Sequence, residues 1–291
     1  MKDLKYICIL TLILVPVSIV ANKKVEYPRA EIKVSYNYYE KFLRGSDGVA
    51  ERNNEFVLLF NASYSKFYSP TTEYLDSLDS TPSGKKQYEQ MLNAVMSEVI
   101  RTNNYDLVPH KKGDIYVFKN RKETTVTVYE QMGLTESGCY SEPLAEIEWT
   151  IGDSTKIVLG YECMVAYADY HGRKWTAWFA LELPIQEGPW KLCGLPGLIL
   201  EASESSGQHA FTATGIETST KKIVPIYSPE KYEKVNRKEL LRNKRASKTN
   251  GETLSTAILD NFPGSSNHAK ARNPIGKIAT DVDFLETDYH L

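Results

Sequence analysis

Gly194-Leu195-Pro196-Gly197-Leu198-Ile199-Leu200 is an apolar run broken by two glycines and a proline. Proline cannot donate a backbone hydrogen bond to a sheet, and glycine accepts positive φ angles or close backbone contact. The stretch therefore predicts a bend or bulge that leads into a buried strand. A second interpretation stays open, in which Gly194, Pro196 and Gly197 form a backbone lip beside an apolar groove.

The residues on both sides of this motif, 147–218, predict an antiparallel sheet. Strand-like runs are separated by turn residues roughly every 8 to 15 positions, which is typical of a meander and not of alternating strands and helices. The predicted strands of this region cover residues 146–151, 156–170, 175–183, 198–202 and 209–216. Earlier runs at 56–68 and 115–129 add further strands.

Two helical segments are predicted. Residues 85–101 place apolar side chains three and four positions apart, as an amphipathic helix packed on a sheet does. Residues 228–248 begin with Ser228-Pro229, a favourable N-cap followed by a favourable first helical residue. This second segment carries eight basic and three acidic residues. We expect a solvated helix face there or, as the alternative, a docking or lipid-headgroup patch.

The domain organisation follows from these patterns. Residues 1–21 join a weakly basic start to an apolar run of about 15 residues, shorter than the roughly 20 that span a bilayer, and predict a cleaved secretory signal. Residues 22–227 form the predicted β domain, with 85–101 as a helical insertion, and residues 228–248 form the basic helix. Residues 249–291 are rich in small polar side chains and predict a partly disordered tail.

Composition and motifs argue against several functions. The formal net charge of -2, with 42% hydrophobic and 25% charged residues, is ordinary for a globular protein and gives no sign of nucleic-acid binding. The five histidines are scattered, and no nucleophile elbow or metal-ligand spacing is present. We therefore expect no enzyme activity, no catalytic residues, no metal and no cofactor.

Three cysteines follow the predicted signal: Cys139, Cys163 and Cys193. An oxidising compartment favours one disulfide and one leftover thiol. Cys163 and Cys193 fall in the best-defined sheet region and are the preferred pair. The alternative is three buried, unpaired thiols that pack as small hydrophobic residues.

Three tryptophans, Trp175, Trp178 and Trp190, lie around one hairpin and the turn that follows it. Strand alternation directs Trp175 to the apolar face and Trp178 to the other face. One interpretation is a sheet that is packed on both sides. The other is an aromatic platform that binds a lipid chain, a peptide or a glycan.

Several short motifs resemble the GLPGLI family, a group of exported proteins of Gram-negative bacteria. They are residues 160–166, Gly172-Arg173, Ala177-Trp178, residues 188–190 and the opening motif. Asn273-Pro274-Ile275 also resembles the closing motif of the family, although Gly276 stands where the family has an acidic residue. The family has no established activity. The resemblance implies a fold similar to lipoprotein carriers, a curved antiparallel sheet with helices on its concave side.

Together these observations predict an α+β protein, mainly antiparallel β. We expect a curved meander sheet or half-barrel, with one helix packed on it and a C-terminal basic helix. The expected function is that of a non-catalytic, exported binding or carrier module of the periplasm or cell envelope, not membrane-spanning after signal cleavage. Its ligand would be an apolar chain or a polypeptide segment. The alternative is an assembly accessory that docks on an envelope protein through the basic helix, and a thiol-redox or metal-handling protein is a distant third.

Overall fold

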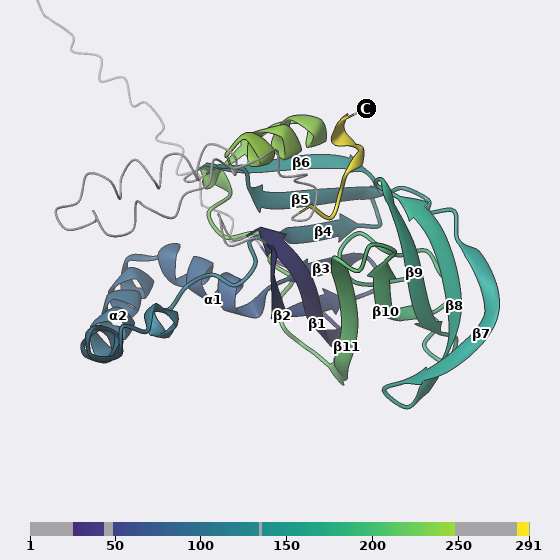
Figure 1. Cartoon of the computed structure of the whole chain (residues 1–291), viewed down its shortest axis with the longest axis horizontal. Helices are drawn as coiled ribbons and strands as arrows, with labels where there is room; N and C mark the ends of the chain where they lie inside the picture. The colour runs from purple at the N-terminus through teal and green to yellow at the C-terminus, as the bar shows by residue number, and fades with distance from the viewer. Residues whose placement is uncertain (1–25, 44–48, 134–135, 248–283, 291) are drawn as a thin grey trace, which may run out of the picture.

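The computed structural model describes residues 26–43, 49–133, 136–247 and 284–290. Twelve strands form one sheet in the order β12-β6-β5-β4-β3-β2-β1-β11-β10-β9-β8-β7 (Figure 1). Neighbouring strands are antiparallel, except that β12 lies parallel to β6. The strands are β1 Ile32–Leu43, β2 Val49–Phe60, β3 Tyr64–Tyr68, β4 Tyr116–Asn120, β5 Thr125–Gln131, β6 Ser137–Pro143, β7 Thr150–Val158, β8 Tyr161–Tyr170, β9 Arg173–Ala180, β10 Leu198–Glu204, β11 His209–Thr218 and β12 Tyr232–Lys234.

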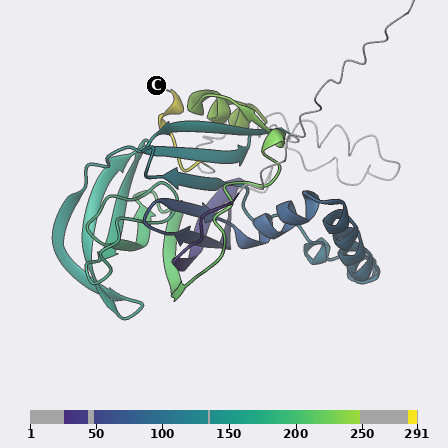
Figure 2. The ribbon, with the colours of Figure 1, turned by 180° about the vertical axis from the view of Figure 1, so that it is seen from behind.

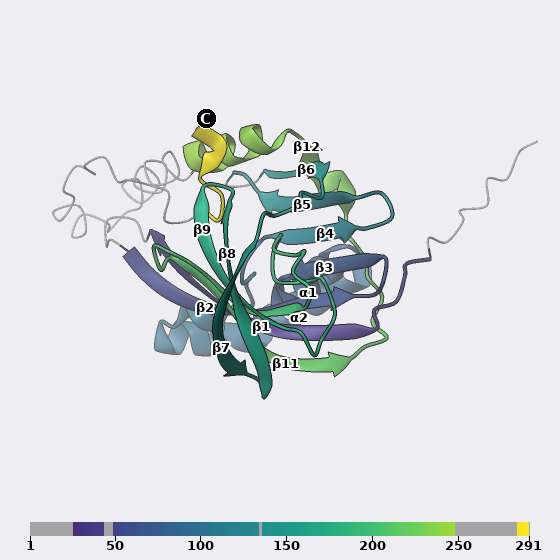
Figure 3. The ribbon, with the colours of Figure 1, turned by 90° about the vertical axis from the view of Figure 1, so that its right-hand side faces the viewer.

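The connection between β6 and β7 forces this sheet to curl. Ten strand spacings of about 4.8 Å separate these two strands, so a flat sheet would hold them roughly 48 Å apart. The chain from Pro143 to Thr150 reaches about 25 Å at most. The two ends of the sheet must therefore approach each other, as Figure 3 shows. The sheet remains open, with β12 and β7 as its edges, and the predicted curved antiparallel sheet is confirmed.

The predicted strands 146–151 and 156–170 are divided differently in the structure. β7 continues through Gly152-Asp153 with an irregular register, and it ends at Val158. Leu159 and Gly160 both have positive φ angles, 51° and 84°, and form a tight hairpin turn before β8. The alternating apolar residues of 156–170 therefore belong to two strands, because the turn at Leu159-Gly160 breaks the pattern that suggested one.

Side chains are buried on both faces of the sheet. The main core fills the concave face and includes Phe56 and Trp175. A second cluster covers the other face, where Leu59 packs with Ile223 from the segment that follows β11. Residues 56–60 are buried at every position for this reason, whereas a strand with one wet face would alternate.

The helix that lies against the sheet is α1, Pro70–Asp79, which the sequence patterns did not predict. Ser69 caps it by accepting a hydrogen bond from the Thr72 N–H, and Leu75 and Leu78 are buried. The predicted amphipathic helix exists as α2, Pro82–Thr102. It packs on α1 and extends away from the sheet, as both faces of the molecule show (Figures 1 and 2). The expectation that α2 packs on the sheet is therefore wrong.

The chain after β11 departs from the predicted basic helix at 228–248. Pro229–Lys231 forms a single 3₁₀ turn, β12 follows, and residues 237–247 are helical. This helix starts after Asn236, whose Oδ1 accepts the N–H of Glu239 at 2.9 Å. The predicted tail is also ordered at its end, because Phe284 and Tyr289 are buried. The predicted signal, residues 1–21, and residues 249–283 lie outside the described residues. Within the described ranges, no helix has the length and apolar character needed to cross a membrane.

Candidate functional site

The first four residues of the opening motif, 194–197, end a segment, residues 181–197, that connects β9 to β10 and packs into the concave face of the sheet (Figure 3). The last three, 198–200, begin β10. Trp190, Leu192 and Leu195 of this segment belong to the main core. Gly194 has a φ of 93°, and a Cβ on Gly197 would lie 2.1 Å from the carbonyl oxygen of Ala180. The first glycine is required for its backbone angle and the second for its close approach to β9. These features support a bend that leads into the buried strand β10.

Two cations of β4 and the residues after it hold this segment in place. Lys119 is fully buried and donates to Glu187 Oε2 at 3.0 Å and to the Leu192 carbonyl at 3.2 Å. Arg121 donates to Glu187 Oε1 from Nε at 3.0 Å and from Nη2 at 2.7 Å. Burial raises the pKa of Glu187, but the charges of Lys119 and Arg121 outweigh burial and lower it. The carboxylate therefore stays ionised inside the core.

The three tryptophans do not form one surface. Trp175 and Trp190 are buried in the concave core, with ring centroids 5.7 Å apart. Trp178 lies on the other face of β9, where the Lys156 ammonium sits 4.4 Å from its ring centroid. Pro196 and Gly194 are exposed, while Gly197 is buried against β9. The candidate platform of Trp175, Trp178 and Trp190 is therefore not assembled, because strand alternation separates its members.

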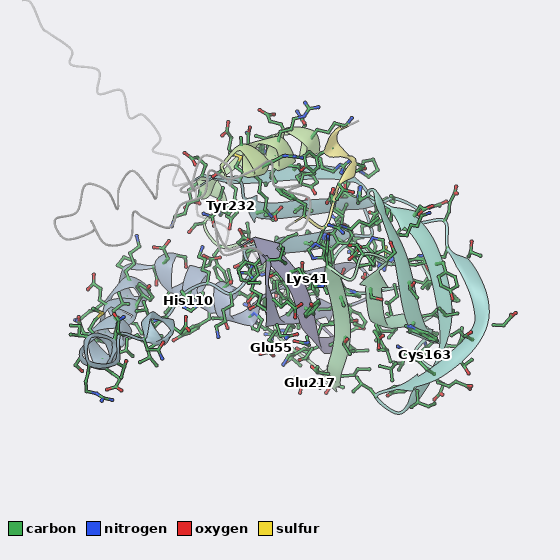
Figure 4. All side chains as sticks on the ribbon, in the orientation of Figure 1. Lys41, Glu55, His110, Cys163, Glu217 and Tyr232 are labelled. Atoms are coloured by element: carbon green, nitrogen blue, oxygen red, sulfur yellow. The ribbon has the colours of Figure 1, made fainter. Side chains whose placement is uncertain are left out.

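The predicted Cys163–Cys193 disulfide is not formed. All three described cysteines are free and buried. Burial is the main cause that raises the pKa of each thiol, which keeps the thiols protonated and unreactive. Figure 4 shows Cys163 at the β7–β9 end of the sheet and His110 far from it, beside the helices. A thiol–imidazole pair is therefore not formed by these two residues.

The C-terminal residues 284–290 are bound between the β8–β9 hairpin and helical residues 237–247. Thr287 donates its N–H to the His171 carbonyl at 2.9 Å and its hydroxyl to the Gly172 carbonyl at 3.0 Å. Arg173 donates to the Phe284 carbonyl at 2.9 Å from Nε. A Cβ on Gly172 would lie 2.4 Å from Thr287 Oγ1, so this glycine lets the segment approach the turn. The segment is thus held by its main chain as well as by its side chains.

Buried ion pairs complete this attachment. Lys191 is 1% exposed and lies 2.5 Å from Glu142 and 2.8 Å from Glu286. Arg237 lies 2.6 Å from Glu286 and 2.7 Å from Asp288. We call Glu142, His171, Lys191, Arg237, Glu286 and Asp288 the charge cluster. It joins five separate parts of the chain: β6, the β8–β9 turn, the motif segment, helical residues 237–247 and residues 284–290.

The carboxylates of the charge cluster are ionised at neutral pH. Burial raises the pKa of Glu142, but hydrogen bonds from His171 and Lys191 outweigh it and lower this pKa to about 2. Burial raises the pKa of Glu286, but the nearby charge of Lys191 lowers it, and the pKa is lowered overall. Asp288 behaves in the same way beside Arg237. The attachment is therefore electrostatic and sensitive to acid.

The charge cluster also contains three atoms at metal-ligand spacing. His171, Glu286 and Asp288 offer ligand atoms that all lie within 4.8 Å of one another. His171 Nδ1 is 3.4 Å from Asp288 and 3.7 Å from Glu286, close to the roughly 3.4 Å between neighbouring ligands of a tetrahedral zinc. Lys191 and Arg237, however, already neutralise the same carboxylates. We therefore assign no metal to these residues.

A cavity of about 310 Å³ adjoins the C-terminal segment on the concave side. Its wall combines aromatic rings with charged side chains from β1, β2, β5 and the C-terminal helix. The lining residues are Tyr38, Glu40, Phe42, Arg52, Phe56, Lys111, Gly113, Asp114, Ile115, Glu130, Gln131, Trp190, Leu241, Lys244, Phe284, Leu285 and Glu286. Of the predicted site residues, only Trp190 lines it.

None of the residues of the charge cluster was predicted from the sequence as a site residue. One signal was available: Lys191 stands between Trp190 and Leu192 in an otherwise apolar stretch. A buried lysine needs a carboxylate partner, so its position indicates an internal ion pair. The other members of the charge cluster are spread along the sequence between residues 142 and 288, and no local sequence pattern connects them.

Comparisons with known proteins add a partial similarity. A search of curated proteins found no significant match. Among solved structures, the chain is similar to PNGF-II in C2 and P21 crystals, each with a TM-score of 0.47 and with 14% and 15% identity. These matches cover 75% of this chain and 33% and 34% of the PNGF-II chains, so the chain spans about a third of that length. The profile of a family described as "Protein of unknown function (Porph_ging)", the GLPGLI-type family of Bacteroidetes, matches residues 170–201. That short match covers the β8–β9 turn, β9 and the motif segment.

Proposed function

We propose that this protein is a non-catalytic, exported binding module whose concave side receives an extended polypeptide segment. The observation that carries the proposal is the seating of residues 284–290, a peptide of the same chain, against the β8–β9 turn. Residues 248–283 separate this peptide from helical residues 237–247. A peptide attached through such a spacer competes with an external peptide as a tethered ligand does.

The contacts made by residues 284–290 suggest what the external segment has to offer. The His171 carbonyl accepts the Thr287 N–H, and the Arg173 side chain donates to the Phe284 carbonyl. Both contacts use main-chain groups of the bound segment, which any peptide offers. Lys191 and Arg237 select the carboxylates of Glu286 and Asp288. Phe284 and Tyr289 add apolar anchors. We infer an acidic peptide flanked by aromatic residues.

A polypeptide fits this concave side better than an apolar chain does. The motif segment fills the apolar interior with Trp190, Leu192 and Leu195. The adjoining cavity has a charged wall, which would cost free energy to cover with a hydrocarbon. The alternative accessory role, docking through the basic helix, is less supported. Two of the cations of that helix, Arg237 and Lys244, are used in internal ion pairs.

A peptide-exchange experiment tests the proposal. The double variant Glu286→Gln/Asp288→Asn weakens the hold on the native segment, and a fluorescein-labelled peptide of residues 283–291 is then added. Fluorescence anisotropy should detect saturable binding to the variant, and binding to the wild type should be at least about tenfold weaker because of the tethered competitor. A peptide with the same two substitutions is the matched control and should not bind. The proposal fails if the folded variant, checked by circular dichroism, ignores the native peptide or binds both peptides equally. Asp288→Asn alone serves as a milder variant.

A further inference from the structure

The 310 Å³ cavity has the character of a small-molecule site when residues 284–290 are seated, because Phe284, Leu285 and Glu286 belong to its wall. Ligand pockets typically start at about 300 Å³ and combine apolar walls with a few polar groups. The rings of Tyr38, Phe42, Phe56 and Trp190 provide the apolar part of this wall. The polar part consists of charged side chains, and the balance between their negative and positive charges decides which ligand fits.

The negative charges of this wall are only partly balanced. Glu40 pairs with Arg52 at 2.7 Å, Glu130 pairs with Lys244, and Glu286 is held by the charge cluster. Lys111, the remaining cation, is 2.6 Å from Asp76, outside the lining residues. Asp114 is half-buried and forms no direct ion pair with the other residues that the structure describes, although Arg52 and Lys244 lie close enough to feel its charge. The cavity thus presents one carboxylate that lacks a direct cation partner and can pair with a ligand cation.

Lys244 demonstrates that this wall accepts an ammonium group. Burial lowers the pKa of Lys244, but the carboxylates of Glu130 and Asp114 outweigh burial, and the pKa is raised overall. Its Nζ also lies 5.5 Å from the ring centroid of Phe284, within the range of a cation–π contact. The surroundings therefore favour a buried positive charge, although burial alone would oppose it.

A second observation indicates a hydrogen-bond acceptor on the ligand. Trp190 is fully buried, and its Nε1 finds no hydrogen-bond partner among the described residues. An unsatisfied buried donor costs about 1–3 kcal/mol, so native proteins rarely leave one. Trp190 lines the cavity. The nitrogen has almost no open surface, so an acceptor atom of a bound molecule would satisfy this N–H once the surrounding side chains shift.

We propose that the cavity binds a small organic amine that also carries a hydrogen-bond acceptor. Its ammonium group pairs with Asp114, its carbon frame lies among the aromatic rings, and its acceptor receives the indole N–H of Trp190. No covalent step is involved.

Isothermal titration calorimetry of the full chain in phosphate buffer tests this site with two nearly isosteric probes. Tyramine carries the ammonium group, and tyrosol carries a hydroxyl in its place. We expect saturable binding of tyramine to one site, and on the order of tenfold weaker binding of tyrosol, because tyrosol cannot neutralise a carboxylate. Asp114→Asn should reduce tyramine binding to the level of tyrosol. The matched control Asp153→Asn, an exposed aspartate of β7, should leave it unchanged.

Three results would overturn the proposal: no saturable heat with tyramine, equal affinity for both probes, or unchanged tyramine affinity in Asp114→Asn. Trp190→Phe gives an independent measurement, because it removes the N–H and keeps an aromatic ring. In this variant tyramine should lose its advantage over phenethylamine, which lacks the phenolic oxygen. The peptide-exchange experiment uses no amine, so the two proposals can fail separately.

Discussion

Replacing Glu187 with glutamine should remove the charge that neutralises two cations beneath the motif segment. Glu187 is 2% exposed, and it binds Lys119 at 3.0 Å and Arg121 at 2.7 Å. Lys119 is 1% exposed and would be left without its carboxylate partner. Glutamine preserves the size of the side chain, so the change isolates the electrostatic contribution.

The expected cost follows from the burial of Lys119. Removing one partner of a buried ion pair typically destabilises a protein by about 3–5 kcal/mol, because the other charge stays uncompensated. Arg121 is 28% exposed and regains water contact, so we expect the lower end, about 3 kcal/mol. The double variant Lys119→Met/Glu187→Leu removes both buried charges and should lose less stability than Glu187→Gln alone.

Urea unfolding followed by tryptophan fluorescence measures these free energies. The control is Asp169→Asn, which breaks the exposed ion pair with Lys174 and should cost less than about 1 kcal/mol. A loss below about 1 kcal/mol for Glu187→Gln would refute the reasoning, since it would mean that the buried carboxylate contributes no more than a surface one. A double variant less stable than the single variant would refute it as well.

The pH dependence provides a second check of the same residue. The folded-state pKa of Glu187 is lowered, so its contribution is present above the unfolded pKa of about 4.3 and is lost as pH falls. The stability difference between the wild type and Glu187→Gln should therefore narrow below about pH 5. A difference that stays constant down to pH 3 would contradict the charge-based explanation.

Three further predictions concern the motif, the C-terminal segment and the thiols. Gly197→Ala should lower the free energy of unfolding by about 1–3 kcal/mol, because the new Cβ clashes with Ala180. Gly194→Ala should lower it by about 1 kcal/mol through the positive φ alone, because the space around Gly194 is open. Urea unfolding of both variants checks that Gly197→Ala is the less stable. Acidification from about pH 5 toward pH 2 should release residues 284–290 as Glu142, whose pKa is about 2, and its acidic neighbours take up protons. Hydrogen exchange at the Thr287 amide, corrected for its intrinsic rate, should then accelerate, and unchanged protection would exclude an electrostatic attachment. After non-reducing denaturation, peptide mapping should find Cys139, Cys163 and Cys193 all labelled by iodoacetamide; any pair protected until reduction would establish a disulfide.

The elements that sequence periodicity predicted best are those whose environment is local. β10 and β11 lie at the predicted positions, and α2 includes the predicted helix. The errors arose where tertiary contacts replaced local preference. Tyr232–Lys234 reads as part of a helix, yet it pairs with β6 because an open sheet edge offers backbone partners there. α1 was not predicted because its ten residues carry few apolar side chains.

The candidate sites also divide into features set by the local sequence and features set by tertiary contacts. The roles of Gly194 and Gly197 could be stated from the motif, because φ and Cβ limits belong to the residue type. The charge cluster could not be predicted from the sequence. Its members Glu142, Lys191, Arg237 and Asp288 are separated by up to 146 positions and meet only when the sheet curls.

The sequence by itself determined the antiparallel sheet, the helical segment at 85–101 and the bend at the motif, since these follow from side-chain alternation and backbone chemistry. It also indicated export, which stays a prediction. Only the tertiary structure decided that the interior of the curl is filled by the motif segment, that the tryptophans are separated, and that the C-terminal residues return to the β8–β9 turn. The physical reason is that a buried charged side chain needs a partner of opposite charge, and this partner can come from any part of the sequence. Ion pairs between residues so far apart produce no periodic pattern in the sequence.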